Sequence, residues 1–91
     1  MRLDLFLKLS RLIPKRTLAQ EYAKQGLVSL NGKPAKPSSE VKDGDEIEIR
    51  KRSTIRVVKV LEVPSGKQVS KKDSSTLYEQ VSLVDLDPLL D

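Results

Sequence analysis

The chain has 91 residues, of which 37% are hydrophobic and 33% charged, so it has room for one domain with a modest core. It contains no Cys and no His, which excludes disulfides, thiol or imidazole catalysis, and zinc sites built from these side chains. Residues 1–60 hold 14 Lys/Arg and 7 Asp/Glu whereas residues 61–91 hold 3 and 6, and this basic body with an acidic tail indicates a polyanionic partner rather than an evenly solvated surface.

Apolar residues near the start of the chain recur at helical spacing. Leu3, Phe6 and Leu7 share one face of a helix that we expect over residues 2–10. Leu5 and Leu9 fall outside this stripe, so they either widen the buried face or form an exposed apolar contact.

A second helix is expected over residues 15–25. Pro14 ends the preceding helix and suits the first turn of the next one, and Gly26 supplies a left-handed stop. Its apolar face consists of Leu18, Ala19, Tyr22 and Ala23.

Lys15 and Arg16 stand at the start of this second helix, where the helix dipole disfavours cations. Backbone N–H groups and two cations at one helix start form an anion site, which we favour over a solvated pair. Arg11 in the preceding turn adds to the positive charge.

A β-hairpin follows. Residues 27–30 read as a short strand, and Asn31-Gly32 is a strong signal for a two-residue turn in which both residues have positive φ. Residues 33–35 return as an edge strand, which Pro34 restricts.

The rest of the basic region predicts further loops and strands. We expect a loop at 36–39, a turn at 43–45, a strand at 46–49, a basic turn at 50–53 and a β-branched strand at 55–63. Val41 is expected to anchor the loop to the core. In the last strand Ile55 and Val57 share one face, to which Leu61 can be added, whereas Val58 and Val60 do not fit a clean alternation.

The C-terminal third is more polar. We expect residues 64–75 to form a flexible connection, a short helix containing Leu77, Tyr78 and Val81 to pack back, and residues 85–91 to form a mobile acidic tail. The predicted domain therefore covers residues 1–63, and residues 64–91 form an extension.

Enzymatic functions find little support. The available nucleophiles are Ser, Thr, Tyr and Lys, with no imidazole to activate them. Carboxylates cluster in one turn and one strand, whose alternation splits them over two faces, so a solvated rim is the better interpretation (Asp43, Asp45, Glu46 and Glu48). We expect no enzyme, no metal and no cofactor. No apolar run approaches the roughly 20 residues that span a bilayer, so we expect a cytoplasmic protein without membrane contact.

Nucleic-acid binding is better supported, because residues 2–36 hold eight Lys/Arg against two acidic residues. These cations come from two helices and a hairpin, and they can lie along one side if those elements pack together. Phe6 and Tyr22 look like core residues, so the aromatic platform used for single strands is missing. Recognition by phosphates and shape suits structured RNA.

The sequence also resembles a known family. The motifs are Arg2-Leu3-Asp4-x-Phe6-Leu7, Arg11-Leu12, Arg16-x-x-Ala19, Gly26-x-Val28-x-x-Asn31-Gly32, Lys36-Pro37-Ser38 and Gly44-Asp45-x-Ile47. In this order and spacing, over about residues 2–50, they resemble the S4-type RNA-binding domain. Lys15 departs from the pattern, since many members have a Ser that caps the second helix there.

The resemblance implies an α+β fold of the S4-like (αL) type, with two N-terminal helices on a small, mostly antiparallel sheet and a short C-terminal extension. Many members are appendages of RNA-modifying enzymes or tRNA synthetases, and this chain has no room for such a catalytic domain. It is similar to small stand-alone bacterial members that act in ribosome-associated quality control. The implied function is binding to obstructed large ribosomal subunits that carry peptidyl-tRNA.

By the same resemblance, the protein would contact large-subunit rRNA and tRNA. It would support C-terminal tailing of the stalled nascent chain beside the tailing factor of the quality-control complex, and we expect it to be a monomer. The expected RNA-binding residues are Arg2, Asp4, Lys8, Arg11, Lys15, Arg16, Lys24, Asn31, Gly32, Lys33 and Lys36. Asp4 either holds Arg2 or Arg11 in place or serves only as a first-turn acid, and the hairpin tip would reach RNA through backbone and ammonium groups.

Two alternatives stay open. The first is a ribosome-assembly or heat-shock RNA chaperone that binds free large subunits. The second is a protein-interaction adaptor, with Leu5, Leu9 and the acidic Leu-rich tail as its contact surface.

Overall fold

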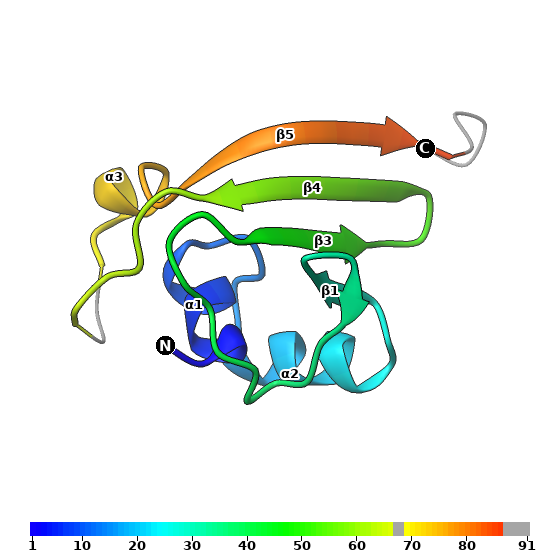
Figure 1. The fold of residues 1–91 in the computed structure, drawn as a ribbon, viewed down its shortest axis with the longest axis horizontal. Coiled ribbons are helices and arrows are strands. Elements are labelled where there is room, and N and C mark those ends of the chain that lie inside the picture. Colours follow the sequence, from blue (N-terminus) through cyan, green and yellow to red (C-terminus); the bar gives the residue numbers. More distant parts are fainter. Residues whose placement is uncertain (67–68, 87–91) are drawn as a thin grey trace.

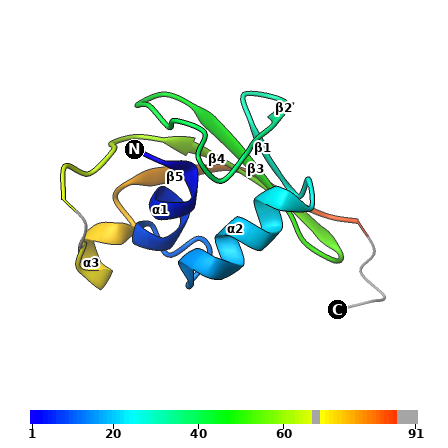
Figure 2. The same ribbon diagram turned by 90° about the horizontal axis from the view of Figure 1, so that it is seen from below.

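Two N-terminal helices lie on one face of a five-stranded antiparallel sheet (Figures 1 and 2). The computed structural model describes residues 1–66 and 69–86. In chain order the elements are α1 (Leu3–Leu9), α2 (Arg16–Lys24), β1 (Val28–Leu30), β2 (Lys33–Pro34), β3 (Glu46–Arg50), β4 (Thr54–Val60), α3 (Lys71–Ser74) and β5 (Tyr78–Asp85). The strand order is β2-β1-β3-β4-β5. The predicted α+β architecture is therefore confirmed.

The helix α1 buries the stripe that the sequence predicts. Leu3, Phe6 and Leu7 are fully buried, and Leu9 is buried as well, so it widens the apolar face. Leu5 is half-buried. Leu9 is therefore not available to the contact surface expected for a protein-interaction adaptor.

The helix α2 has a narrower buried face than predicted. Ala19 and Ala23 are buried and Tyr22 packs half-buried against the core, but Leu18 is 40% exposed, so its expected place in the core is wrong. Leu18 is one residue from Ala19, about 100° around the helix, and this rotation carries it off the face that meets the sheet. Gly26, with φ of 78°, ends the helix as predicted.

The hairpin turn has the predicted geometry. Asn31 and Gly32 have φ values of 53° and 84°, and β1 pairs antiparallel with β2. Pro34 lies on β2, which is an edge strand, so its missing N–H group interrupts no ladder on the open side.

The sheet contributes its core residues from one face. Ile47 and Ile49 on β3 are buried, and Ile47 is in register with Val58. Val58 and Val60 are the buried residues of β4. Ile55 and Val57 share the other face of β4, as expected, and are partly buried. Val58 and Val60, which seemed irregular, face the helices, and Leu61 lies beyond β4 and is 47% exposed. Val41 is 1% exposed and anchors its loop as expected.

The expected helix around residues 77–81 is wrong, because Tyr78–Asp85 forms β5, which pairs with β4 along its length. A bulge lies opposite Val57 and Val58. Leu77 is buried, but β5 is an edge strand whose Val81, Leu83 and Val84 are about half exposed. A short helix does form earlier, as α3. The tail predicted at residues 85–91 begins too early, because Asp85 is the last residue of β5, and residues 87–91 lie outside the described residues. The division at residues 63 and 64 stays a prediction.

Candidate nucleic-acid interface

The first residues of the chain and the loop at 36–41 are fastened together by backbone hydrogen bonds. The N–H of Leu3 donates to the carbonyl of Ser39 at 2.8 Å, and the N–H of Val41 donates to the carbonyl of Met1 at 2.8 Å. An isolated β-bridge joins Arg2 to Glu40. This lacing brings residues that are more than 30 positions apart in the sequence to the same surface.

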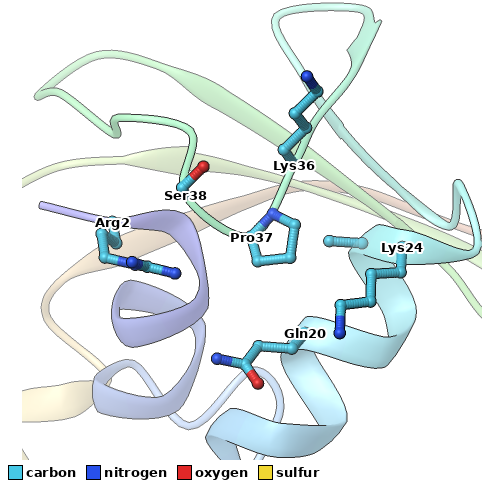
Figure 3. Close-up of a pocket in the computed structure, with 7 residues that line it drawn as sticks. Arg2, Gln20, Lys24, Lys36, Pro37 and Ser38 are labelled. Carbon is cyan, nitrogen blue, oxygen red and sulfur yellow. The ribbon is translucent and has the colours of Figure 1, made fainter.

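A pocket of about 540 Å³ opens where this loop meets the two helices (Figure 3). Its lining consists of Arg2, Gln20, Ala23, Lys24, Lys36, Pro37 and Ser38. Arg2 and Lys24 point toward the space between α1 and α2, while the side chain of Lys36 extends away from it at the rim. Three cations from three separate segments therefore surround a pocket whose lining contains no carboxylate, which is the composition of an anion site. We call it the helix–loop pocket.

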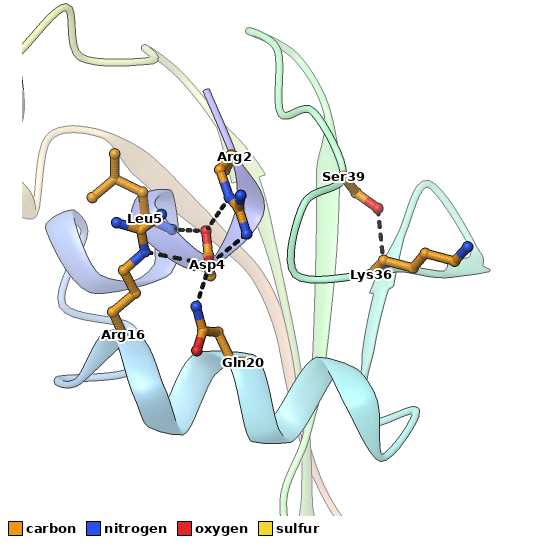
Figure 4. Close-up of polar contacts among 7 residues, drawn as sticks. All are labelled: Arg2, Asp4, Leu5, Arg16, Gln20, Lys36 and Ser39. Atoms are coloured by element: carbon orange, nitrogen blue, oxygen red, sulfur yellow. Dashed lines mark hydrogen bonds and ion pairs between the residues drawn. The ribbon is translucent and has the colours of Figure 1, made fainter.

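The buried carboxylate of Asp4 contacts Arg2 and Gln20, two residues that line this pocket (Figure 4). Its Oδ1 accepts from Arg2 Nε at 3.2 Å and from the backbone N–H of Leu5 at 2.8 Å. Its Oδ2 accepts from Arg2 Nη2 at 3.2 Å and from Gln20 Nε2 at 2.9 Å, and Arg16 Nε lies 3.3 Å away. Asp4 therefore fixes two arginines from two helices, and this supports the prediction that it holds Arg2. The second arginine is Arg16, whereas no hydrogen bond or ion pair among the described residues joins Asp4 to Arg11.

The electrostatics of Asp4 follow from these contacts. Burial alone raises the pKa of Asp4, but the hydrogen bonds from Gln20, Arg2, Arg16 and the Leu5 N–H together outweigh burial and lower this pKa below 3.8. The carboxylate is thus charged at neutral pH. The side chains of Arg2 and Arg16 are 51% and 42% exposed, so each guanidinium is held on one edge and open to solvent on another.

The structure leaves the other predicted residues outside the helix–loop pocket. Lys8 lies in the last turn of α1, and Arg11 takes a positive φ of 61° in the turn that follows. Lys15 occupies the N-cap position of α2, but its side chain makes no capping hydrogen bond. All three are exposed. Arg16 turns from the expected anion site at the start of α2 toward Asp4. The RNA-binding roles of all these residues stay predictions.

The hairpin tip is likewise separate from the pocket lining. Asn31 Nδ2 donates to Asp45 at 3.1 Å, and its Oδ1 accepts from the Glu46 N–H at 2.9 Å. The Asn31 side chain therefore braces the turn against the start of β3. Gly32 and Lys33 are exposed, and their contact with RNA through backbone and ammonium groups stays a prediction.

The sequence-based reasoning missed Gln20, which lines the pocket and donates to Asp4. The spacing held a signal: Arg16, Gln20 and Lys24 recur every four residues and so share one face of α2. A polar face between two cations is unremarkable until a buried carboxylate is known to lie opposite.

The described residues hold neither a candidate metal site nor a candidate membrane span. Over residues 1–66 and 69–86, the Asp and Glu side chains form no group of three that could hold a metal ion. In the same part of the chain, no helix has the length and apolar character to cross a membrane.

Comparisons with known proteins agree with this arrangement. The model of the S4 domain matches residues 1–47. The chain is 51% identical over 78 residues to a protein of Bacillus subtilis named RQC P-site tRNA stabilizing factor, covering 86% of this chain and 88% of that protein. A protein of the same name from Halalkalibacterium halodurans is 48% identical over 79 residues, with 87% and 88% covered.

Among solved structures, the trimeric Heat Shock Protein 15 of Vibrio cholerae superimposes with a TM-score of 0.80 at 27% identity. The match covers 90% of this chain and 82% of that protein. The share of the chain that superimposes is larger than the 47 residues matched by the S4 model, so the similarity extends beyond that region.

Proposed function

The chain belongs to the S4-domain family, and within it to the proteins named RQC P-site tRNA stabilizing factors, and we propose that it stabilises P-site tRNA on the large ribosomal subunit in ribosome-associated quality control. In this role it contacts rRNA and peptidyl-tRNA and supports C-terminal tailing of the stalled nascent chain. It acts by binding rather than by catalysis, as a monomer in the cytoplasm, beside the tailing factor.

The observation that carries the proposal is the pair of arginines held by Asp4, of which Arg2 lines the helix–loop pocket and Arg16 contacts the same carboxylate. A guanidinium fixed on one edge keeps its remaining N–H groups in a set direction, so less side-chain entropy is lost when a phosphate binds. Lys24 and Lys36 add point charges around the same pocket. Such a surface reads the phosphate backbone and the shape of a folded RNA rather than its bases.

The similarity to Heat Shock Protein 15 supports a second candidate function. This candidate is an RNA chaperone that binds free large subunits, and it would use the same pocket. Sedimentation of tagged protein from cells separates the two: in the proposed function peptidyl-tRNA accompanies the large subunit, and in the alternative it does not.

The proposal is tested by Arg16→Ala, with Lys59→Ala as the matched control. Lys59 is an exposed cation that lies between Glu46 and Glu79 on neighbouring strands, away from the helix–loop pocket. We expect Arg16→Ala to weaken binding to purified large subunits that carry peptidyl-tRNA, and to lower the slope of log affinity against log salt by about one unit.

Lys59→Ala should leave both the affinity and the slope near their original values. Wild-type affinity and an unchanged slope in a folded Arg16→Ala protein would contradict the RNA-binding role of the arginines held by Asp4. Binding that survives nuclease treatment would instead favour the protein-interaction adaptor.

A further inference from the structure

A second concentration of positive charge lies at the turn between β3 and β4. Arg50, Lys51 and Arg52 follow one another there, and all three are exposed. None of the ion pairs among the described residues involves them. In Figures 1 and 2 this turn lies at the far end of the long axis from the start of α1, so it is remote from Arg2 and the loop laced to it.

A pocket of about 420 Å³ lies beside this turn, over the paired strands β4 and β5. It is lined by Lys51, Thr54, Arg56, Gln80 and Leu83. Leu83 is 56% exposed, so the pocket combines two cations with polar groups and an open apolar surface. This composition can take a phosphate together with the flat face of a sugar or base.

Arg56 is held in this pocket in a fixed position. Its Nη2 donates to the Tyr78 hydroxyl at 3.2 Å, and its guanidinium carbon lies 5.5 Å from the centre of the Tyr78 ring. Its Nε–H is buried and has no hydrogen-bond partner among the described residues. A buried donor without a partner is unfavourable, and an acceptor supplied by a ligand would satisfy it.

We propose that the β3–β4 turn and the pocket beside it form a second phosphate-binding surface, which holds an RNA segment different from the one at the helix–loop pocket. Lys51 and Arg56, which line the pocket, would bind the phosphates, and Arg50 and Arg52 would add positive charge beside it. Asp85 lies opposite Thr54 on β5 and brings one negative charge to the same end of the sheet, against these four cations.

This inference rests on the proposed function and adds a division of labour to it. A factor that touches rRNA and tRNA together needs two electropositive surfaces that do not compete for one strand. The turn lies at the far end of the long axis from the start of α1 (Figure 1), whereas its Arg50 N–H donates to the carbonyl of Leu27 at 2.8 Å, just after α2. The turn and the Arg2 side of the helix–loop pocket can therefore face two folded RNAs.

The absence of cysteine from the chain allows a direct test. Iron–EDTA attached to a single introduced cysteine generates hydroxyl radicals that cut nearby RNA. We would compare Lys51→Cys at the turn, Lys24→Cys at the helix–loop pocket and Lys59→Cys as the control. Each full-length protein would be bound to large subunits carrying peptidyl-tRNA, and the cuts in rRNA and tRNA mapped by primer extension.

We expect Lys51→Cys to cut nucleotides that Lys24→Cys leaves intact, and the control to cut weakly at either set. Cuts from Lys24→Cys with none from Lys51→Cys would contradict the proposal of a second RNA-binding surface. Identical cuts from both variants would contradict it too. Either result would leave the proposed function unaffected. Loss of cuts from both positions would count against the proposed function itself.

A second measurement does not depend on the tether. Lys51→Ala should lower the salt slope by roughly one unit while Lys59→Ala leaves it unchanged. Because Lys51 is exposed, its replacement does not disturb the core, and an unchanged slope would contradict its contact with phosphate. A partner protein that stays bound to the wild type after nuclease treatment, but not to Lys51→Ala, would show that the turn binds protein. This result would also overturn the proposal.

Discussion

Replacing Asp4 by Asn tests whether a buried charge organises the helix–loop pocket. The substitution keeps the size of the side chain but turns one acceptor oxygen into a donor. Asp4 is 0% exposed, and every group that faces it is a hydrogen-bond donor. The asparagine amide must therefore place its own N–H groups against other donors, whichever way it is turned.

The expected loss follows from the contacts of the two oxygens. If the amide oxygen stays with the Leu5 N–H and Arg2 Nε, the contacts with Arg2 Nη2, Gln20 and Arg16 are lost. Hydrogen bonds to a charged group are worth about 1.5–3 kcal/mol each, but Arg2 and Arg16 are about half exposed and regain water. We therefore expect the free energy of unfolding to fall by about 2 kcal/mol in total. For a domain of this size the midpoint of thermal unfolding falls by roughly 10 °C.

Thermal and urea unfolding followed by circular dichroism measures this loss, with Glu21→Gln on the exposed side of α2 as a control. The pKa of Asp4 is lowered in the folded protein, so its contribution is complete above pH 3.8 and is lost as the pH falls through the folded-state value. The gap between wild type and Asp4→Asn should then close in acid. A wild-type midpoint for Asp4→Asn at pH 7, or an equal gap at pH 7 and pH 2.5, would refute the reasoning.

Three further substitutions probe other parts of the fold and site. Gln20→Ala removes one neutral donor to Asp4, and we expect a loss of about 1 kcal/mol in urea unfolding together with weaker binding to large subunits; unchanged values of both would sink its role as a brace. Gly32→Ala meets no atom within 4 Å, so its cost of about 1 kcal/mol should come only from the positive φ, and a neutral result would contradict the turn geometry. Ile47→Val should lower the free energy of unfolding by about 1 kcal/mol, and an increase would show that this core position is overpacked.

The local signals in the sequence predicted the N-terminal half of the fold well. Gly26, Asn31 and Gly32 take the positive φ values that their types favour, and the helical stripe of α1 is buried. These features depend on short-range sterics and on periodicity, both of which are written into neighbouring residues.

The features that sequence reasoning missed depend on partners far along the chain. β5 is an edge strand exposed on most positions, so its residues carry no clean alternation, and Tyr78 and Val81 could be fitted to a helix instead. Val58 and Val60 became core residues only because the helices cover that face of the sheet. The pairing of Arg16 with Asp4 likewise required the packing of α1 against α2, which spacing alone does not reveal.

The lacing between the first residues and the loop at 36–41 bears on how the chain behaves before it is complete. A strongly cationic polypeptide risks sticking to any polyanion while it emerges from its own ribosome. Here the Met1 carbonyl and the Leu3 N–H find their partners only after residues 39 and 41 have been synthesised. Until then Arg2 and Lys36 are not brought to one pocket, so the helix–loop pocket forms late in synthesis, as a product of tertiary closure.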